Sequence, residues 1–207
     1  MSELSGPRTP GTRGPRAKLD NTAVFSSAAR WIAEGRRLDM RALAAELGVT
    51  RMTLHRYTGG RERLIGGGLW VLAAATWRRR TDEEDARRSP GDRELRSVRV
   101  IRAYNTDVFT SPRVRQLFDA EPELSLRVLT DPQGPIQPRS VAVAVELIES
   151  DEIAGRLRPV IDREQLAHAL VKLAEAFLFS DLASGRPASL DAANEVQAAL
   201  LEAGRRP

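Results

Sequence analysis

The chain has 207 residues, of which 42% are hydrophobic and 29% charged, so it is a globular protein of one larger or two small domains and not a disordered chain. Its lack of cysteine excludes disulfides and a cysteine nucleophile, and its two histidines, His55 and His168, are too few for a multi-histidine metal site. The longest uncharged run, Leu64–Trp77, is too short to cross a bilayer. We therefore expect a cytoplasmic protein without a metal, a cofactor or a membrane partner.

Basic residues are concentrated at the N-terminal end. Residues 1–80 carry 15 Lys and Arg against 6 Asp and Glu, a net charge of +9, whereas residues 81–207 carry 17 against 22, a net charge of −5. A bias toward arginine explains why 30 of the 32 basic residues are arginine, but not why the second part is acidic. The division predicts that the N-terminal part binds a polyanion. Residues 1–18, rich in Gly, Pro and Arg, are predicted to form a disordered basic tail.

Residues 19–65 have the pattern of three helices. The first is expected over 20–35, where apolar residues recur every three to four positions and a glycine follows. Asp39 and Thr50 are the expected N-caps of two short helices, each of which ends at glycine. Two short helices joined by a glycine-containing turn are typical of a helix-turn-helix.

The rest of the chain also has helical periodicity. Helices are expected over 61–80, 92–109, 112–119, 122–130, 138–153, 162–183 and 190–203, with a polar loop at 82–91. Alternating Val and Ala at 141–145 fit a strand as well, but no second strand is evident to pair with it. The sequence therefore predicts an all-α fold.

The segment 43–65, LAAELGVTRMTLHRYTGGRERLI, resembles the N-terminal domain of the TetR family of transcriptional regulators. The resemblance is strongest over 21–65, and beyond that it rests on helical layout and length. It implies a helix-turn-helix DNA-binding domain at 19–65 and a helical ligand-binding and dimerisation domain at 66–207. Residues 40–49, together with 59–62 and 69–70, are similar to the actinobacterial branch typified by the regulator of a quorum-signal lactonase, which implies a lactone-type effector.

The start of a recognition helix reaches base edges in the major groove. Arg51 and Met52 hold those positions, and the hydroxyls of Thr50 and Thr53 are expected to face phosphates. Arg41 and Arg56 are further candidate contacts, although any single arginine also fits a solvated surface charge.

Four further positions are interpreted by the resemblance. The family contacts the DNA backbone through a Tyr and a His two residues apart, and here His55 and Tyr57 hold these positions in swapped order. Arg61 stands where the family has a Lys, which retains the positive charge, and Thr58 stands where it has a core Phe. His55 has no second ligand or carboxylate at a helical spacing, so a metal or catalytic role is disfavoured.

Three consecutive glycines, at 66–68, lie inside an expected helix, where each costs roughly 0.5–1 kcal/mol relative to alanine. Three interpretations remain: a phosphate-binding loop, for which no nucleotide fingerprint is present, close packing on the N-terminal domain, or a hinge. The hinge hypothesis predicts that replacing all three with alanine raises stability and weakens ligand-triggered release.

The apolar arc of the helix at 162–183 is wider than one packed face needs, which predicts a partner. With the last helix it is expected to form a four-helix bundle across a two-fold axis, through Leu166, Leu170, Leu173, Phe177, Val196 and Leu200. The alternative is a helix central to the core of a monomer.

The acidic second part is expected to hold a pocket for a small-molecule effector. The candidate lining residues are apolar with a few polar groups, as small-molecule sites usually are: Trp70, Trp77, Tyr104, Asn105, Phe109, Gln116, His168 and Phe177. Each of them fits a core or surface position as well.

The function predicted from these features is a homodimeric DNA-binding repressor that a small molecule releases from a palindromic, double-stranded operator. Two alternatives belong to other classes: an architectural DNA-binding protein without a ligand, and a small helical enzyme. The enzyme is disfavoured, because the sequence has no GxSxG, HExxH or nucleotide-binding motif.

Overall fold

The computed structural model describes residues 20–89, 92–185 and 189–206, so the predicted tail at 1–18 lies outside the described residues. The described part of the chain forms ten helices, and its only β-type pairing is an isolated bridge between Leu157 and Arg205. The predicted all-α fold is confirmed. Residues 141–145 lie within a helix, so the strand alternative is wrong.

Three short helices form the N-terminal part: α1 (Asn21–Ala33), α2 (Met40–Glu46) and α3 (Arg51–Thr58). Local capping explains where they begin. The carboxylate of Asp39 accepts hydrogen bonds from the amides of Arg41 and Ala42, at 2.9 and 2.7 Å. Thr50 Oγ1 accepts one from the amide of Thr53 at 3.1 Å, and α3 ends at Gly59, whose φ of 78° is left-handed.

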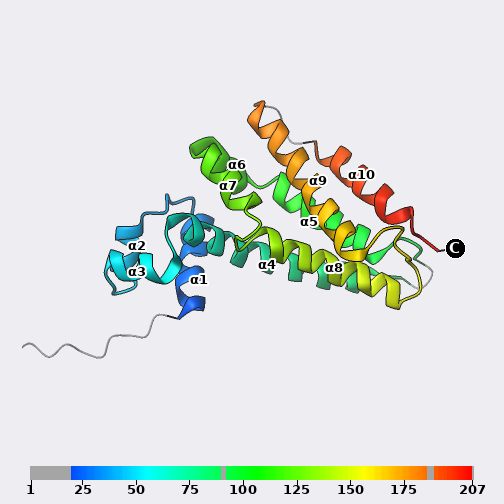
Figure 1. Ribbon diagram of the computed structural model, residues 1–207, viewed down its shortest axis with the longest axis horizontal. Coiled ribbons are helices and arrows are strands. Elements are labelled where there is room, and N and C mark those ends of the chain that lie inside the picture. Colours follow the sequence, from blue (N-terminus) through cyan, green and yellow to red (C-terminus); the bar gives the residue numbers. More distant parts are fainter. Residues whose placement is uncertain (1–19, 90–91, 186–188, 207) are drawn as a thin grey trace, which may run out of the picture.

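Seven helices follow. They are α4 (Arg61–Arg87), α5 (Arg96–Phe109), α6 (Pro112–Ala120), α7 (Pro122–Thr130), α8 (Gln137–Ile153), α9 (Arg163–Ala183) and α10 (Leu190–Glu202). Figure 1 shows α1–α3 at one end of an elongated molecule and α8, α9 and α10 toward the other, with α4 running from one to the other. The predicted boundary at 65–66 falls inside α4, so the two predicted domains share one helix.

Helix α4 is longer than predicted, because it continues from Arg80 to Arg87 through a segment that we expected to be a loop. Ion pairs hold this polar extension on α5. Asp107 of α5 accepts hydrogen bonds from Arg79 Nη2 and Arg80 Nε, both at 2.7 Å, and Arg96 forms a bidentate pair with Asp85 at 2.7 Å. The guanidinium of Arg80 lowers the pKa of Asp107. Non-local ion pairs therefore stabilise helix where the local pattern indicated a break.

Helix α5 begins at Arg96, four residues later than predicted, because its cap comes from α8. Asp151 is fully buried and accepts hydrogen bonds from the amides of Arg96 and Ser97, at 3.0 and 2.8 Å, and from Ser97 Oγ at 2.7 Å. Arg156 lies 3.2 Å from the same carboxylate. A carboxylate is stable in the interior when hydrogen bonds and a cation compensate its charge, and the positive end of a helix adds to that.

Gly66, Gly67 and Gly68 form the surface of α4 that contacts α1 and the loop before α8. A Cβ on Gly66 would lie 2.7 Å from Pro135 Cγ, one on Gly67 would overlap the ring of Phe25, and one on Gly68 would lie 3.0 Å from the backbone carbon of Ala28. The helix runs through the three glycines without interruption. Close packing therefore explains the three glycines, and it predicts that alanine lowers the stability of the protein rather than raising it.

We predict that Gly67→Ala lowers the free energy of unfolding by about 1–3 kcal/mol, because the added methyl group forces the Phe25 ring to move. Helix propensity alone would raise the free energy of unfolding by roughly 0.5–1 kcal/mol. The propensity effect and the packing effect of the added methyl group therefore differ in sign. Urea denaturation measures the difference. In a Phe25→Ala background the same substitution should become neutral or stabilising, and a stabilising effect with Phe25 present would contradict the packing argument.

Candidate DNA interface and effector cavity

The recognition helix α3 presents its predicted base-reading residues to solvent. Met52 is 76% exposed, and Arg51, His55 and Arg56 are exposed beside it. This exposure leaves the predicted base-reading side chains accessible to another molecule. Arg41 is also exposed, on the neighbouring helix α2.

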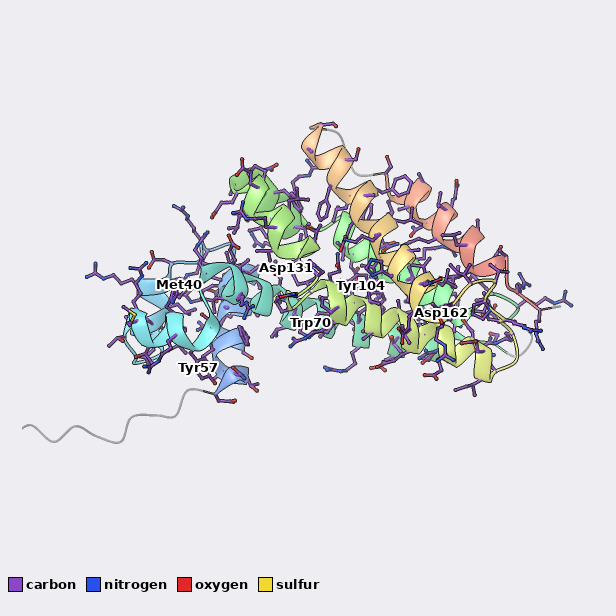
Figure 2. The ribbon with its side chains drawn as sticks, viewed as in Figure 1. Met40, Tyr57, Trp70, Tyr104, Asp131 and Asp162 are labelled. Carbon is purple, nitrogen blue, oxygen red and sulfur yellow. The ribbon has the colours of Figure 1, made fainter. Side chains whose placement is uncertain are left out.

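The predicted phosphate contacts have mixed surroundings. The hydroxyls of Thr50 and Thr53 lie 2.8 Å apart, and Thr50 is the N-cap of α3, so both hydroxyls already take part in a local hydrogen bond. Tyr57 is 38% exposed, and in Figure 2 it lies on α3 at the same end of the molecule as Met40. These three residues lie on the helix-turn-helix, and their contact with DNA stays a prediction.

Thr58 is buried, although the resemblance implied a phenylalanine at this position. Its hydroxyl shares one proton between the carbonyls of Leu54 and Gly60, at 3.0 and 3.3 Å, and accepts from the amide of Gly60 at 3.3 Å. The buried hydroxyl is thus hydrogen-bonded. Thr58 fixes the turn between α3 and α4 by hydrogen bonds rather than by apolar packing.

Arg61, a predicted DNA contact, is held by Glu121 of the second domain. Its two terminal nitrogens donate to the two carboxylate oxygens at 2.7 and 2.6 Å, and its Nε donates to the carbonyl of Leu38 at 3.0 Å. Arg37 lies 3.6 Å from the same carboxylate. The hydrogen bonds from Arg61 lower the pKa of Glu121. A phosphate contact by Arg61 therefore stays a prediction that requires this pair to open.

A hollow of about 120 Å³, here called the central cavity, lies between the helices of the second domain. Its wall is mainly apolar and includes residues from every helix between α4 and α10. They are Trp77, Ile101, Tyr104, Asn105, Val108, Phe109, Val114, Leu129, Ile136, Ser140, Ala144, Leu170, Val171, Ala174, Glu175, Leu178, Phe179 and Gln197. An apolar hollow with a few polar groups is typical of a small-molecule site.

Four of the eight predicted effector residues line the central cavity: Trp77, Tyr104, Asn105 and Phe109. Trp77 and Tyr104 are stacked, with ring centroids 3.6 Å apart, and burial raises the pKa of Tyr104, so its hydroxyl is neutral. Figure 2 shows Tyr104 among the helices of the second domain and Trp70 closer to the DNA-binding end.

The other four predicted effector residues lie elsewhere. Trp70 packs between the two hydrophobic cores of the molecule, and Gln116 lies in a separate hollow, with its amide 3.4 Å from the carbonyl of Gly35. His168 is exposed, and Phe177 is half-buried outside the cavity wall. Helical periodicity identified α4 and α5 as cavity helices, but not which turns of α6–α9 reach the cavity.

The predicted dimer residues divide into two groups. Leu166 and Leu170 are 1% exposed and belong to the core of the protomer itself, so their assignment to a dimer surface is corrected. Leu173, Phe177 and Leu200 are half-buried, and Val196 is 39% exposed. The wide apolar arc of α9 thus has one side buried within the protomer and another that is accessible.

The described residues contain no helix long and apolar enough to cross a membrane. Within the same residues, no group of three or more His, Asp or Glu side chains is placed to hold a metal ion.

We predict that Glu121→Gln lowers the free energy of unfolding at pH 7 by about 1–2 kcal/mol, because it removes the charge from a partly buried, bidentate pair. Since Arg61 lowers the pKa of Glu121 in the folded state, this stabilisation is present above the ordinary carboxyl pKa of about 4.3 and is lost as the pH falls through the lowered value. Denaturation at several pH values measures it. Glu123→Gln, at a 92% exposed side chain, is the control and should change little. An equal loss at pH 7 and at about pH 3 would contradict the charge-based explanation.

Comparison with known proteins agrees with this geometry. The family model "Tetracyclin repressor-like, C-terminal domain" matches residues 94–202. The structure of the transcriptional repressor QsdR of R. erythropolis, from the TetR family, is 28% identical, covers 90% of this chain and 96% of its own, and has a TM-score of 0.76. No curated protein matches the sequence.

Two further solved structures are more distant. A TetR-like transcriptional regulator from Rhodococcus sp. RHA1 is 18% identical over 91% of this chain and 96% of its own, with a TM-score of 0.41. A TetR-family regulator from Rhodococcus sp. is 16% identical over 89% and 97%, with a TM-score of 0.44. The match of the family model over more than half of the chain, together with the helix-turn-helix fold, shows that the chain belongs to the TetR family of transcriptional regulators.

Proposed function

We propose that this regulator is a homodimeric repressor that binds a palindromic operator and leaves it when a small molecule occupies the central cavity. The observation that carries the proposal is the course of α4, which begins beside the recognition helix and contributes Trp77 to the cavity wall. A single rigid helix between two sites transmits a displacement at one of them to the other. The similar protein QsdR is described as a transcriptional repressor, which supports the sign of the regulation.

A second contact between the central cavity and the DNA-binding part supports the proposed coupling of ligand binding to DNA binding. Leu129 of α7 and Ile136 line the central cavity and also pack on the core of the DNA-binding part, which contains Leu64 and Ile65. A ligand that moves these two side chains changes the packing beneath α1–α3 directly. The Arg61–Glu121 pair adds a polar link between the same parts. Release requires that the ligand bind better to the arrangement that does not fit the operator.

The accessible apolar residues of α9 and α10 support a dimer. Leu173, Phe177, Val196 and Leu200 lie on helices that are neighbours at the far end of the molecule from α3 (Figure 1). Two copies joined through this face would carry two recognition helices, and a two-fold axis requires a palindromic operator. The lactone-type effector implied by the resemblance stays a prediction.

The operator is tested by selecting bound duplexes from a random pool at about 150 mM salt, where nonspecific attraction is screened. We expect a palindromic motif whose half-sites are centred about one helical turn apart.

Arg51→Ala should lower the affinity for the selected operator by about 1–3 kcal/mol and relax the base preference at one position of the motif. Tyr57→Phe should instead weaken binding to all DNA sequences alike. Binding without any enriched motif would favour the architectural alternative.

We predict that Leu173→Asp combined with Val196→Asp gives a folded monomer, because each introduces a charge into the proposed apolar interface. Light scattering measures the molecular mass of the variant. Its operator affinity should fall by at least about a hundredfold, because a monomer contacts only one half-site of the operator. Leu126→Asp is the control, at a 46% exposed leucine on α7. An unchanged mass for the double variant, with circular dichroism unchanged, would refute this interface.

A further inference from the structure

Polar groups in the wall of the central cavity define the chemistry of its ligand. We infer that the effector is an uncharged, mainly hydrocarbon molecule of fewer than about ten non-hydrogen atoms that donates a hydrogen bond, as a hydroxyl group does, to Asn105. This inference rests on the proposed role of the central cavity as the effector site. Three observations carry it: the charges of the wall, the orientation of a chain of amides, and the volume.

The wall disfavours a charged ligand. It contains no Lys, Arg or His, so an anion entering it would lose its hydration without gaining a counter-charge. Its single carboxylate, Glu175, already accepts hydrogen bonds from Gln137 Nε2 at 3.0 and 3.1 Å and from Lys172 Nζ at 3.0 Å. A cationic ligand would have to displace these donors. An uncharged ligand meets neither cost.

The orientation of Asn105 follows from a single backbone carbonyl. The carbonyl of Leu170 is only an acceptor, so the Gln197 atom that lies 2.7 Å from it is the amide nitrogen. Gln197 Oε1 therefore faces Asn105 and accepts from Asn105 Nδ2 at 2.6 Å. Asn194 Oδ1 accepts from the same nitrogen at 2.9 Å. Both protons of the Asn105 amide are thus used within the protein, and its orientation does not depend on a choice between nitrogen and oxygen.

The acceptor of the same amide is left for the ligand. Asn105 is 3% exposed and lines the central cavity, and its Oδ1 accepts no hydrogen bond from the described residues. This oxygen keeps some accessible surface in a residue that is otherwise buried, so a ligand that supplies an O–H or N–H gains a hydrogen bond there within a mainly apolar wall. A ligand that can only accept hydrogen bonds, such as a simple lactone ring, does not satisfy this oxygen, so the inferred ligand class competes with the lactone-type effector that the resemblance implies.

The volume and a second polar group complete the description. About 120 Å³ is close to the size of engineered apolar cavities of ~150 Å³ that hold benzene, so the cavity accepts a ligand of six to nine non-hydrogen atoms, roughly, without rearrangement. The indole N–H of Trp77, also in the wall, is buried without a hydrogen bond of normal geometry. A hydroxyl group suits either position, because it donates through its proton and accepts through its oxygen.

Four probes, each with six carbon atoms, test the inference on the unaltered full-length protein. They are hexan-1-ol, 1-methoxypentane, hexanoate and hexylammonium. Calorimetry measures their affinities. We expect hexan-1-ol to bind about fivefold to tenfold tighter than the ether, the factor that corresponds to one net hydrogen bond, and both ions to bind more weakly than the alcohol. An ether that binds as tightly as the alcohol, a tighter hexanoate or hexylammonium, or no binding by any probe would overturn the inference.

Asn105→Ala identifies the acceptor. It should reduce the affinity ratio of alcohol to ether from about fivefold or more to about one while leaving the ether affinity within about twofold. Gln116→Ala is the matched control, because this amide lies outside the central cavity, and it should leave the ratio unchanged. If Asn105→Ala does not fold, the four probes on the unaltered protein still decide. A ratio that survives in folded Asn105→Ala would overturn the assignment.

The same probes separate this inference from the proposed function. Operator binding is measured with and without each probe at saturation. Release of the operator by the ether as readily as by the alcohol, at equal affinity, would support effector-controlled release and overturn the hydroxyl requirement. Tight, Asn105-dependent binding of hexan-1-ol without release would support the ligand class and overturn the release mechanism.

Discussion

The close approach of α1 to α4 is the constraint on which the rest of the structure depends. Helix α4 has no side chains at 66–68, and this allows Phe25, the backbone of Ala28 and Pro135 to contact the helix surface from two sides. One helix is thereby packed into the DNA-binding part along its first turns and into the second domain farther on. The glycines lower intrinsic helix stability, and the packing that they permit outweighs this cost.

Charged groups in this protein act mainly by fixing helices relative to one another. The Arg61–Glu121 pair joins the start of α4 to the start of α7, and the Arg79 and Arg80 contacts with Asp107 and the Arg96–Asp85 pair join α4 to α5. The central cavity, by contrast, is almost free of charge. Much of the acidic excess of the second part is thus engaged in ion pairs, whereas Arg51 and Arg56 stay exposed on α3.

Sequence reasoning succeeded where the signal is local. Asp39 and Thr50 cap the helices that follow them directly, and the prolines at 112 and 122 stand at helix starts, so these boundaries were predictable. It failed where a partner lies far along the chain, as at the start of α5 and in the extension of α4 to Arg87. For the same reason Trp77 and Asn105 were recognised as cavity residues, whereas Gln116 and His168 were misplaced: periodicity gives the face of a helix but not its neighbour.

The capping of α5 by Asp151 constrains how the second domain folds. The acceptor for the first amides of α5 lies 55 residues farther along the chain, so these amides have no protein partner until α8 has docked. During synthesis from the N-terminus, the first turn of α5 gains this stabilising cap only after α8 has been made. The helix-turn-helix, with its local caps, has no such delay. Any shortened chain that ends before α8 would leave the positive end of α5 without its carboxylate, which ties the stability of the second domain to the presence of both helices.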